Sequence, residues 1–108
     1  MITGSNTAVE GEAITLICAV VVSPKPTVTW LKRNAEELRL LRNSSRISVN
    51  NFYDGRTFIH HSTLVIQDAQ EADSGEYLCE VQDATMTLSL VSSQHINISG
   101  ELVAKLQG

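Results

Sequence analysis

The stretch D73-S-G-E-Y-L-C79 is acidic and polar at its start and apolar or aromatic from Tyr77 onward. It places Asp73, Gly75 and Tyr77 at every second position before Cys79, one of only two cysteines in the chain. This spacing suits a β-strand, because alternate side chains of a strand point to the same face. The stretch is therefore either a reactive carboxylate site or a structural corner.

Period-two alternation of apolar residues recurs through most of the chain and predicts half-buried strands. Seven or more short strands, separated by turn signals, are typical of an all-β sandwich. We expect the core of this sandwich to include Trp30, Leu64, Ile66 and Tyr77. The alternating residues are Ile14, Leu16, Cys18 and Val20, then Val28 and Trp30, then Leu64 and Ile66, then Tyr77, Cys79 and Val81.

The connections carry recognisable turn chemistry. Asp54-Gly55 predicts a two-residue hairpin between strands at 46–53 and 56–61. Helical periodicity has two weak candidates, a short uncapped segment at 36–42 and a single turn at 67–73.

The composition of this 108-residue chain indicates one folded domain, with 43% apolar and 19% charged residues. The net charge of −4 argues against nucleic acid as its main partner. Its longest apolar segment, 14–22, is much shorter than the roughly 20 residues that cross a bilayer, so we expect no membrane insertion of the domain. The first six residues lack the basic start and apolar centre of a signal peptide.

Cys18 and Cys79 share the inward phase of two separate strands and lie 61 positions apart, with Trp30 in the inward phase between them. A disulfide that closes so long a loop stabilises a protein by about 4 kcal/mol on the chain-entropy model. The alternative is a pair of buried free thiols, as in a cytosolic protein.

These residues together resemble the immunoglobulin superfamily, and within it the I-set type. The matching stretches are V9-E-G-E12, I14-T-L-I-C18, W30-L-K32, L64-V-I66 and D73-S-G-E-Y-L-C79. The resemblance implies a two-sheet Greek-key sandwich, with strands A, B, E and D in one sheet and C, F, G and A′ in the other. It also implies an inter-sheet Cys18–Cys79 disulfide, a domain over 1–99 and a linker or following segment over 100–108.

The resemblance also implies that the opening stretch is structural. Gly75 is expected to take a tight backbone conformation, and Tyr77 to place its ring in the core and its hydroxyl on a backbone group. Asp73 is expected to form a salt bridge with Arg46, since the family pairs an Arg and an Asp across this end of the sandwich.

The sequence offers no pattern for catalysis, a cofactor or a metal. His60 and His61 are adjacent on a predicted strand, so their side chains point to opposite faces and cannot chelate one ion together. There is no Cys-x-x-Cys, Gly-rich phosphate loop or Gly-x-Ser-x-Gly elbow. We expect a non-enzymatic protein.

Two glycosylation sequons, at Asn43 and Asn97, favour an extracellular or cell-surface setting together with the cysteine pair. Asn43 lies in a predicted polar turn, and Asn97 lies between two inward-facing isoleucines and so points outward. The alternative is an intracellular scaffold, since muscle proteins carry I-set domains of similar pattern.

Function is therefore expected on a surface of the fold. The outward phase of two neighbouring strands holds Leu31 and Leu78, flanked by Arg33 and Glu80, and predicts a protein-binding face of an adhesion, receptor or matrix protein. A second hypothesis is heparan sulfate binding by a basic edge, and a third is a mechanical spacer. The basic residues concerned are Lys32, Arg33, Arg39, Arg42 and Arg46.

Overall fold

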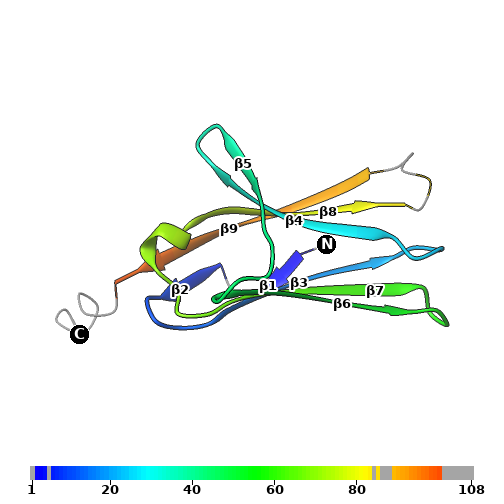
Figure 1. Ribbon diagram of the computed structural model, residues 1–108, viewed down its shortest axis with the longest axis horizontal. Coiled ribbons are helices and arrows are strands. Elements are labelled where there is room, and N and C mark those ends of the chain that lie inside the picture. Colours follow the sequence, from blue (N-terminus) through cyan, green and yellow to red (C-terminus); the bar gives the residue numbers. More distant parts are fainter. Residues whose placement is uncertain (1, 5, 84, 86–88, 101–108) are drawn as a thin grey trace.

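The computed structural model describes residues 2–4, 6–83, 85 and 89–100, which form two facing β-sheets (Figure 1). The four-stranded sheet has the order β1-β3-β7-β6, and the five-stranded sheet has the order β2-β9-β8-β4-β5. The first sheet contains β1 (Ile2–Gly4), β3 (Ile14–Val21), β7 (Ile59–Ile66) and β6 (Ile47–Asp54). The second contains β2 (Thr7–Val9), β9 (Ser89–Ser99), β8 (Gly75–Gln82), β4 (Thr27–Asn34) and β5 (Glu37–Leu40).

Strand pairing is antiparallel in both sheets except where β2 runs parallel to β9. A short 3-10 helix, η1 (Glu71–Asp73), connects β7 to β8 and so joins the two sheets. This arrangement confirms the predicted all-β immunoglobulin-like sandwich and its assignment of strands to sheets. None of the helical structure in the described residues is long and apolar enough to cross a membrane.

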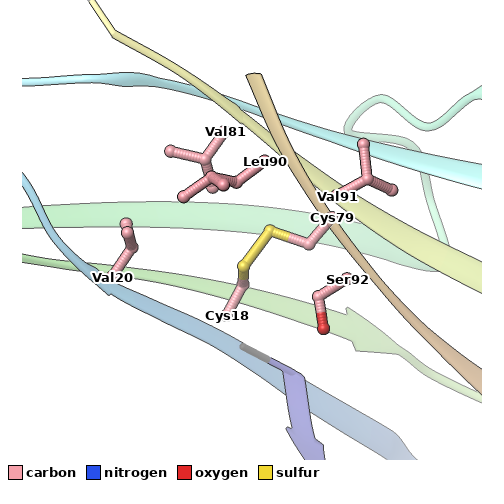
Figure 2. A pocket seen from close by; sticks show the side chains of 7 residues that line it. All are labelled: Cys18, Val20, Cys79, Val81, Leu90, Val91 and Ser92. Atoms are coloured by element: carbon pink, nitrogen blue, oxygen red, sulfur yellow. A yellow bond between two sulfur atoms is a disulfide. The ribbon is translucent and has the colours of Figure 1, made fainter. Parts of the chain in front are cut away.

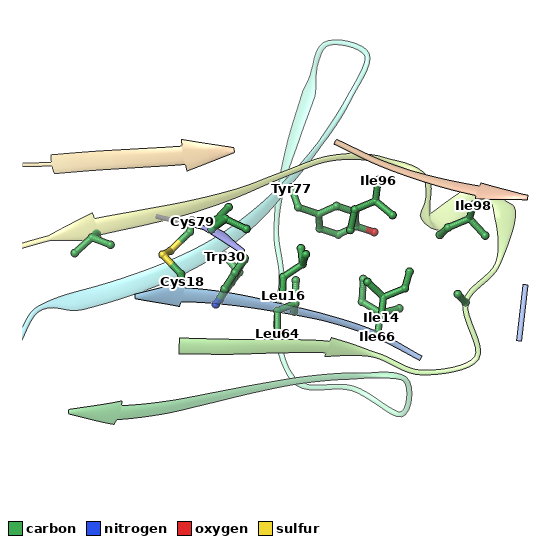
Figure 3. Close-up of a cluster of buried hydrophobic side chains, with 13 residues drawn as sticks. Ile14, Leu16, Cys18, Trp30, Leu64, Ile66, Tyr77, Cys79, Ile96 and Ile98 are labelled. Carbon is green, nitrogen blue, oxygen red and sulfur yellow. A yellow bond between two sulfur atoms is a disulfide. The ribbon is translucent and has the colours of Figure 1, made fainter. Parts of the chain in front are cut away.

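The core lies between the sheets and is crossed by the Cys18–Cys79 disulfide, which confirms the predicted inter-sheet bond (Figure 3). Trp30 lies beside the disulfide, and its Nε1 donates a hydrogen bond to Ser62 Oγ at 2.8 Å. This bond satisfies the indole N–H, which would otherwise be a buried donor without an acceptor. The four residues expected in the core, Trp30, Leu64, Ile66 and Tyr77, are each at most 1% exposed.

Strand alternation accounts for this core. In β3 the inward residues Ile14, Leu16 and Cys18 are buried, and the residues between them, Thr15 and Ile17, are exposed. The same alternation holds along β7. Since the pleat sends successive side chains to opposite faces, the apolar phase of each strand fixes its orientation in the sandwich.

The predicted two-residue hairpin at Asp54-Gly55 is wrong. β6 extends to Asp54 and β7 begins only at Ile59, so four residues form the turn. Asp54 holds this wider turn closed, because its Oδ1 accepts the Arg56 amide at 2.9 Å and its carbonyl accepts the Phe58 amide at 2.8 Å. Phe58 closes the turn with a positive φ of 61°.

Of the two segments predicted as weak helical candidates, one forms a strand and the other contains a short helix. The segment 36–42 forms strand β5 at the edge of the five-stranded sheet, whereas 67–73 contains the 3-10 helix η1. Strand β9 ends at Ser99, next to the predicted boundary of the domain. The predicted linker over 100–108 lies outside the described residues except for Gly100.

Candidate functional site

Apolar side chains form a row across the outer face of the five-stranded sheet. Leu40 of β5 pairs with Leu31 of β4, and Leu31 pairs with Leu78 of β8. Directly paired residues of antiparallel strands share a face, so the three side chains are neighbours. They point away from the core, because Trp30 and Lys32 on either side of Leu31 are buried inward. We call Leu31, Leu40 and Leu78 the outer leucine row.

The prediction that Leu78 projects into solvent is wrong, since its side chain is only 6% exposed. Leu78 lies on the central strand of the sheet, between Leu31 of β4 and Ser93 of β9, and these neighbours cover it from both sides. Leu31 is half-buried for the same reason. Leu78 therefore packs against its neighbours on the outer face and offers little surface to a partner.

Exposed apolar residues of this face are Leu38 and Leu40 of β5, which are 49% and 43% exposed, and Val91 of β9, which is 57% exposed and pairs with Glu80. Leu38 pairs with Arg33, so it lies beside the outer leucine row on the same face. Neither leucine was predicted from the sequence, because the segment 36–42 that holds them has a weak helical periodicity. The alternation in E37-L-R-L40 was the signal that would have placed them on a strand.

Charged side chains border the outer leucine row. Arg33 Nε lies 2.9 Å from Glu76 Oε1, and both side chains are substantially exposed. Glu80 is half-buried and accepts a hydrogen bond from Ser89 Oγ at 3.3 Å. The predicted rim residues Arg33 and Glu80 thus lie on this face, but Arg33 is paired with Glu76. An ion pair this exposed contributes at most about 1 kcal/mol to stability.

The five basic residues proposed to bind heparan sulfate do not form one surface. Lys32 is buried. Its Nζ donates a hydrogen bond to the Ala72 carbonyl at 2.7 Å and lies 5.7 Å from the centre of the Tyr77 ring. Burial lowers the pKa of the Lys32 amine, although Asp73 opposes this effect. Arg33 and Arg46 are held by acidic partners. Among the described residues, only Arg39 and Arg42 of this set are exposed without an ion pair.

The opening stretch builds a corner of the fold. Tyr77 places its ring in the core and its hydroxyl donates to the Asp73 carbonyl at 2.5 Å. Burial raises the pKa of the Tyr77 phenol well above its usual range. Gly75 has a φ of +150°, and a side chain there would approach Asn34 Oδ1 to 3.2 Å. Asp73 pairs with Arg46 at 2.8 Å. The carboxylate is therefore held by structural partners.

Both sequon asparagines are exposed. Asn43 Oδ1 accepts the Val49 amide at 2.7 Å, which leaves its Nδ2 as the group that a glycan would modify. Asn97 lies on β9 between the buried residues Ile96 and Ile98 and points outward.

The histidines do not converge. His60 is buried and His61 is exposed, as expected for neighbours on a strand. Among the described residues, no group of three His, Cys, Asp or Glu side chains is placed to hold a metal ion.

Comparison with known proteins identifies the family. The profile of the immunoglobulin domain family matches residues 1–83, and the chain belongs to this family. Papilin of Drosophila melanogaster is 33% identical over 79 residues, which are 73% of this chain and 2% of papilin. Neural cell adhesion molecule 1 of Gallus gallus is 32% identical over 100 residues, which are 87% of this chain and 8% of that protein.

Solved structures show the same fold. A crystal structure of the complex of titin M10 with an obscurin-like 1 immunoglobulin domain matches with a TM-score of 0.67 and 23% identity, over 87% of this chain and 84% of that chain. The muscle M-line assembly protein unc-89 of Caenorhabditis elegans is also similar, at 27% identity over 82% of this chain and 1% of that protein. The chain spans less than a tenth of papilin, of the adhesion molecule and of unc-89. The similarities indicate a protein-interaction module.

Proposed function

We propose that this domain is a non-enzymatic recognition module of a larger extracellular protein, and that it binds a protein partner through the outer face of its five-stranded sheet. The observation that carries the proposal is the outer leucine row, which ends at the sheet edge in the exposed Leu40 and is extended there by the exposed Leu38. An apolar centre with a polar rim is the usual anatomy of a protein interface. Arg33, Glu76 and Glu80 supply that rim.

The outer face of the four-stranded sheet is less suited to binding a protein partner than that of the five-stranded sheet. Its exposed apolar residues are Phe52, Ile17 and Val21. Phe52 and Ile17 pair with His61 and Thr63, and the pair of Val21 with Ile59 ends at Asp54 on the next strand, so polar side chains interrupt the apolar ones. Scattered apolar side chains of this kind are ordinary on protein surfaces. The continuous row lies only on the five-stranded sheet among the described residues.

An extracellular setting is supported by the disulfide and by the two exposed sequon asparagines. Similarity to a neural cell adhesion molecule agrees with it. The I-set type is supported by the placement of β1 on one sheet and β2 on the other, as the resemblance implies. Similarity to the muscle M-line assembly protein unc-89 keeps an intracellular muscle scaffold as the alternative.

The test begins with a multimerised form of the domain, screened against purified extracellular proteins. The affinity for a partner found in this way is then measured for Leu38→Ser/Leu40→Ser and for the control Phe52→Ser/Ile17→Ser, which alters exposed apolar residues of the other sheet. We expect at least about a tenfold loss of affinity for the first variant and little change for the control. Equal losses in the two variants, or none in the first, would reject the outer face as the binding site.

Heparin serves as the second probe. Heparan sulfate binding predicts salt-sensitive retention on a heparin column that Arg39→Glu/Arg42→Glu abolishes and that Leu38→Ser/Leu40→Ser leaves intact. We expect no such retention, because three of the five basic residues are buried or paired with acidic side chains.

A further inference from the structure

Strand β9 has an open edge along most of its length. β8 pairs with β9 on one side from Ser89 to Ile96, whereas on the other side β2 covers only Asn97 to Ser99. No strand of the described residues pairs with the 89–96 segment on that second side. β1 of the other sheet contacts the segment only through side chains, since Ser92 Oγ accepts the Ile2 amide at 3.2 Å and Gln94 Nε2 donates to the Gly4 carbonyl at 2.9 Å. An open edge presents backbone N–H and C=O groups that bind another extended strand.

The orientation of these backbone groups follows from the bonds to the β2 segment. The Asn97 amide donates to the Asn6 carbonyl at 3.0 Å, and the Ser99 carbonyl accepts the Glu10 amide at 2.9 Å. Backbone groups alternate along a strand, so those of Val91 and Ser93 also point to this edge. The register between β8 and β9 is unbroken over the whole segment, so no bulge disturbs the alternation.

An apolar cavity of about 230 Å³ opens between the sheets beside this edge (Figure 2). Val20 of β3 lies on one side of it and Val81 and Leu90 on the other, with the disulfide beside them. Leu90 pairs with the buried Val81 and so occupies the inward phase, yet its side chain is 64% exposed. The sandwich is thus unfilled at this point, where an apolar side chain would fit.

The edge also lacks the devices that keep open strands apart. Such strands are commonly protected by a charged side chain, a proline or a bulge. The segment 89–94 contains no charged residue and no proline, and it carries Leu90 inward and Val91 outward. Two copies of this chain, each with a net charge of −4, therefore meet here without like charges in contact.

We propose that the β9 edge binds a second copy of this chain, with the two β9 strands antiparallel and Val91 opposite Val91 of the second copy. In this register the backbone N–H and C=O groups of Val91 form hydrogen bonds with those of Val91 in the second copy, across a two-fold axis. Leu90 lies opposite Ser92 of the second copy. Ser92 lines the cavity beside the disulfide, so the Leu90 side chain of each copy sits at the mouth of the other copy's cavity. The pairing joins the two five-stranded sheets into one.

A two-fold contact uses the same patch on both copies. The proposed pairing meets this condition, because the same segment of β9 is used by each copy. The contact is one strand wide, which is small for a protein interface and gives a weak, reversible dimer. It uses an edge of the five-stranded sheet and leaves its outer leucine row free, so it is independent of the binding face proposed above.

The first test is sedimentation velocity from about 10 µM to 1 mM, a range that resolves weak association. We expect concentration-dependent dimerisation that Val91→Lys weakens at least about tenfold, because it places two like charges opposite each other on the edge. Phe52→Lys is the control, since it adds the same charge at an exposed position of β6. Leu38→Ser/Leu40→Ser is expected to dimerise normally, which separates this proposal from the outer binding face.

The second test fixes the register by cross-linking. Residues directly opposite in a hydrogen-bonded antiparallel pair have Cα atoms about 5.5 Å apart, which is within reach of a disulfide. Val91→Cys is expected to form a covalent dimer under mild oxidation, whereas Ser93→Cys, on the same exposed face, is expected to remain monomeric because it lies opposite Ser89. A protein that stays monomeric at 1 mM, roughly the upper limit set above, would overturn the proposal. So would a dimer that Val91→Lys leaves unchanged, or cross-linking at position 93 in place of 91.

Discussion

Arg46 binds Asp73 through both terminal nitrogens, with Nη1 2.8 Å from Oδ2 and Nη2 3.2 Å from Oδ1. The same guanidinium donates to the carbonyls of Gln67 and Asp68 at 3.3 and 3.1 Å. The carboxylate also accepts the Gln70 amide at 2.9 Å. The pair therefore ties the residue preceding β6 to the corner between β7 and β8, where the chain passes from one sheet to the other.

Removing one partner of this pair is expected to be costly. Asp73→Ala leaves a partly buried guanidinium without its counter-charge and the Gln70 amide without its acceptor, so we expect a loss of about 2–4 kcal/mol in the free energy of unfolding. Arg46→Ala is expected to cost a comparable amount. Glu76→Ala is the matched control, because it breaks the exposed pair with Arg33 and should cost at most about 1 kcal/mol. A double-mutant cycle that shows no coupling between Arg46 and Asp73 would contradict the assignment.

The coupling energy between Arg46 and Asp73 is also expected to depend on pH. Burial alone would raise the pKa of Asp73, but the bonds from Arg46 and the Gln70 amide outweigh it and lower the pKa below its ordinary value. A carboxyl with a lowered folded-state pKa stabilises the fold above its unfolded pKa of about 3.9 and loses this contribution as the pH falls through the folded value. Chemical denaturation at pH 7 and at successively lower pH should show the Arg46–Asp73 coupling energy shrinking only below about pH 4.

Tyr77→Phe tests the corner without changing the volume of the core. The variant loses the bond from the hydroxyl to the Asp73 carbonyl, and we expect a cost of about 1–2 kcal/mol, measured as a lower denaturant midpoint. An unchanged midpoint would mean that the hydroxyl contributes nothing to the corner.

The sequence predicted the core because strand alternation is a local property. Each apolar phase, such as Leu64 and Ile66 on β7, faces inward whichever strand lies beside it. The cysteine pair, the tryptophan and the Asp73–Cys79 stretch then specified one particular sandwich. The sheets and the disulfide followed from these signals.

The exposure of the outer face could not be predicted in the same way, because it depends on which strands are neighbours. Leu31 and Leu78 have the same outward phase, yet Leu78 is covered since β8 is flanked on both sides. Leu38 and Leu40 are exposed since β5 lies at the edge of the sheet. The Asp54–Phe58 turn likewise depends on side-chain and backbone bonds that the dipeptide Asp54-Gly55 does not reveal.

The disulfide predicts a chemical and a thermodynamic result. Alkylation of the protein unfolded without reductant, followed by mass spectrometry, should find neither Cys18 nor Cys79 labelled. Reduction removes a cross-link between residues 61 positions apart and is expected to lower the free energy of unfolding by about 4 kcal/mol on the chain-entropy model. Two labelled cysteines in the unreduced protein would reject the disulfide and weaken the proposed extracellular setting.

His60 is expected to make stability fall between pH 7 and pH 5, roughly the window in which histidines titrate. The side chain is 2% exposed, and its Nε2 lies 3.2 Å from Asn51 Oδ1. With this oxygen as acceptor, Nε2 carries the proton, and Nδ1 is left without a hydrogen-bond partner among the described residues. Burial lowers the pKa of His60, and the charges of Lys25 and His61 add to the effect. Protonation would therefore place a charge and an unsatisfied N–H inside the sandwich.

The sign of the pH effect follows from the lowered pKa. As the pH falls through about 6.5, the unfolded chain binds a proton at this position before the folded chain does, so stability decreases, with a limiting slope of about 1.4 kcal/mol per pH unit for one proton. Denaturant unfolding at pH 7, 6 and 5, values that span roughly this titration, should show the decline in the wild type and not in His60→Gln. A His60→Gln variant that loses stability as steeply as the wild type would show that another group binds the proton.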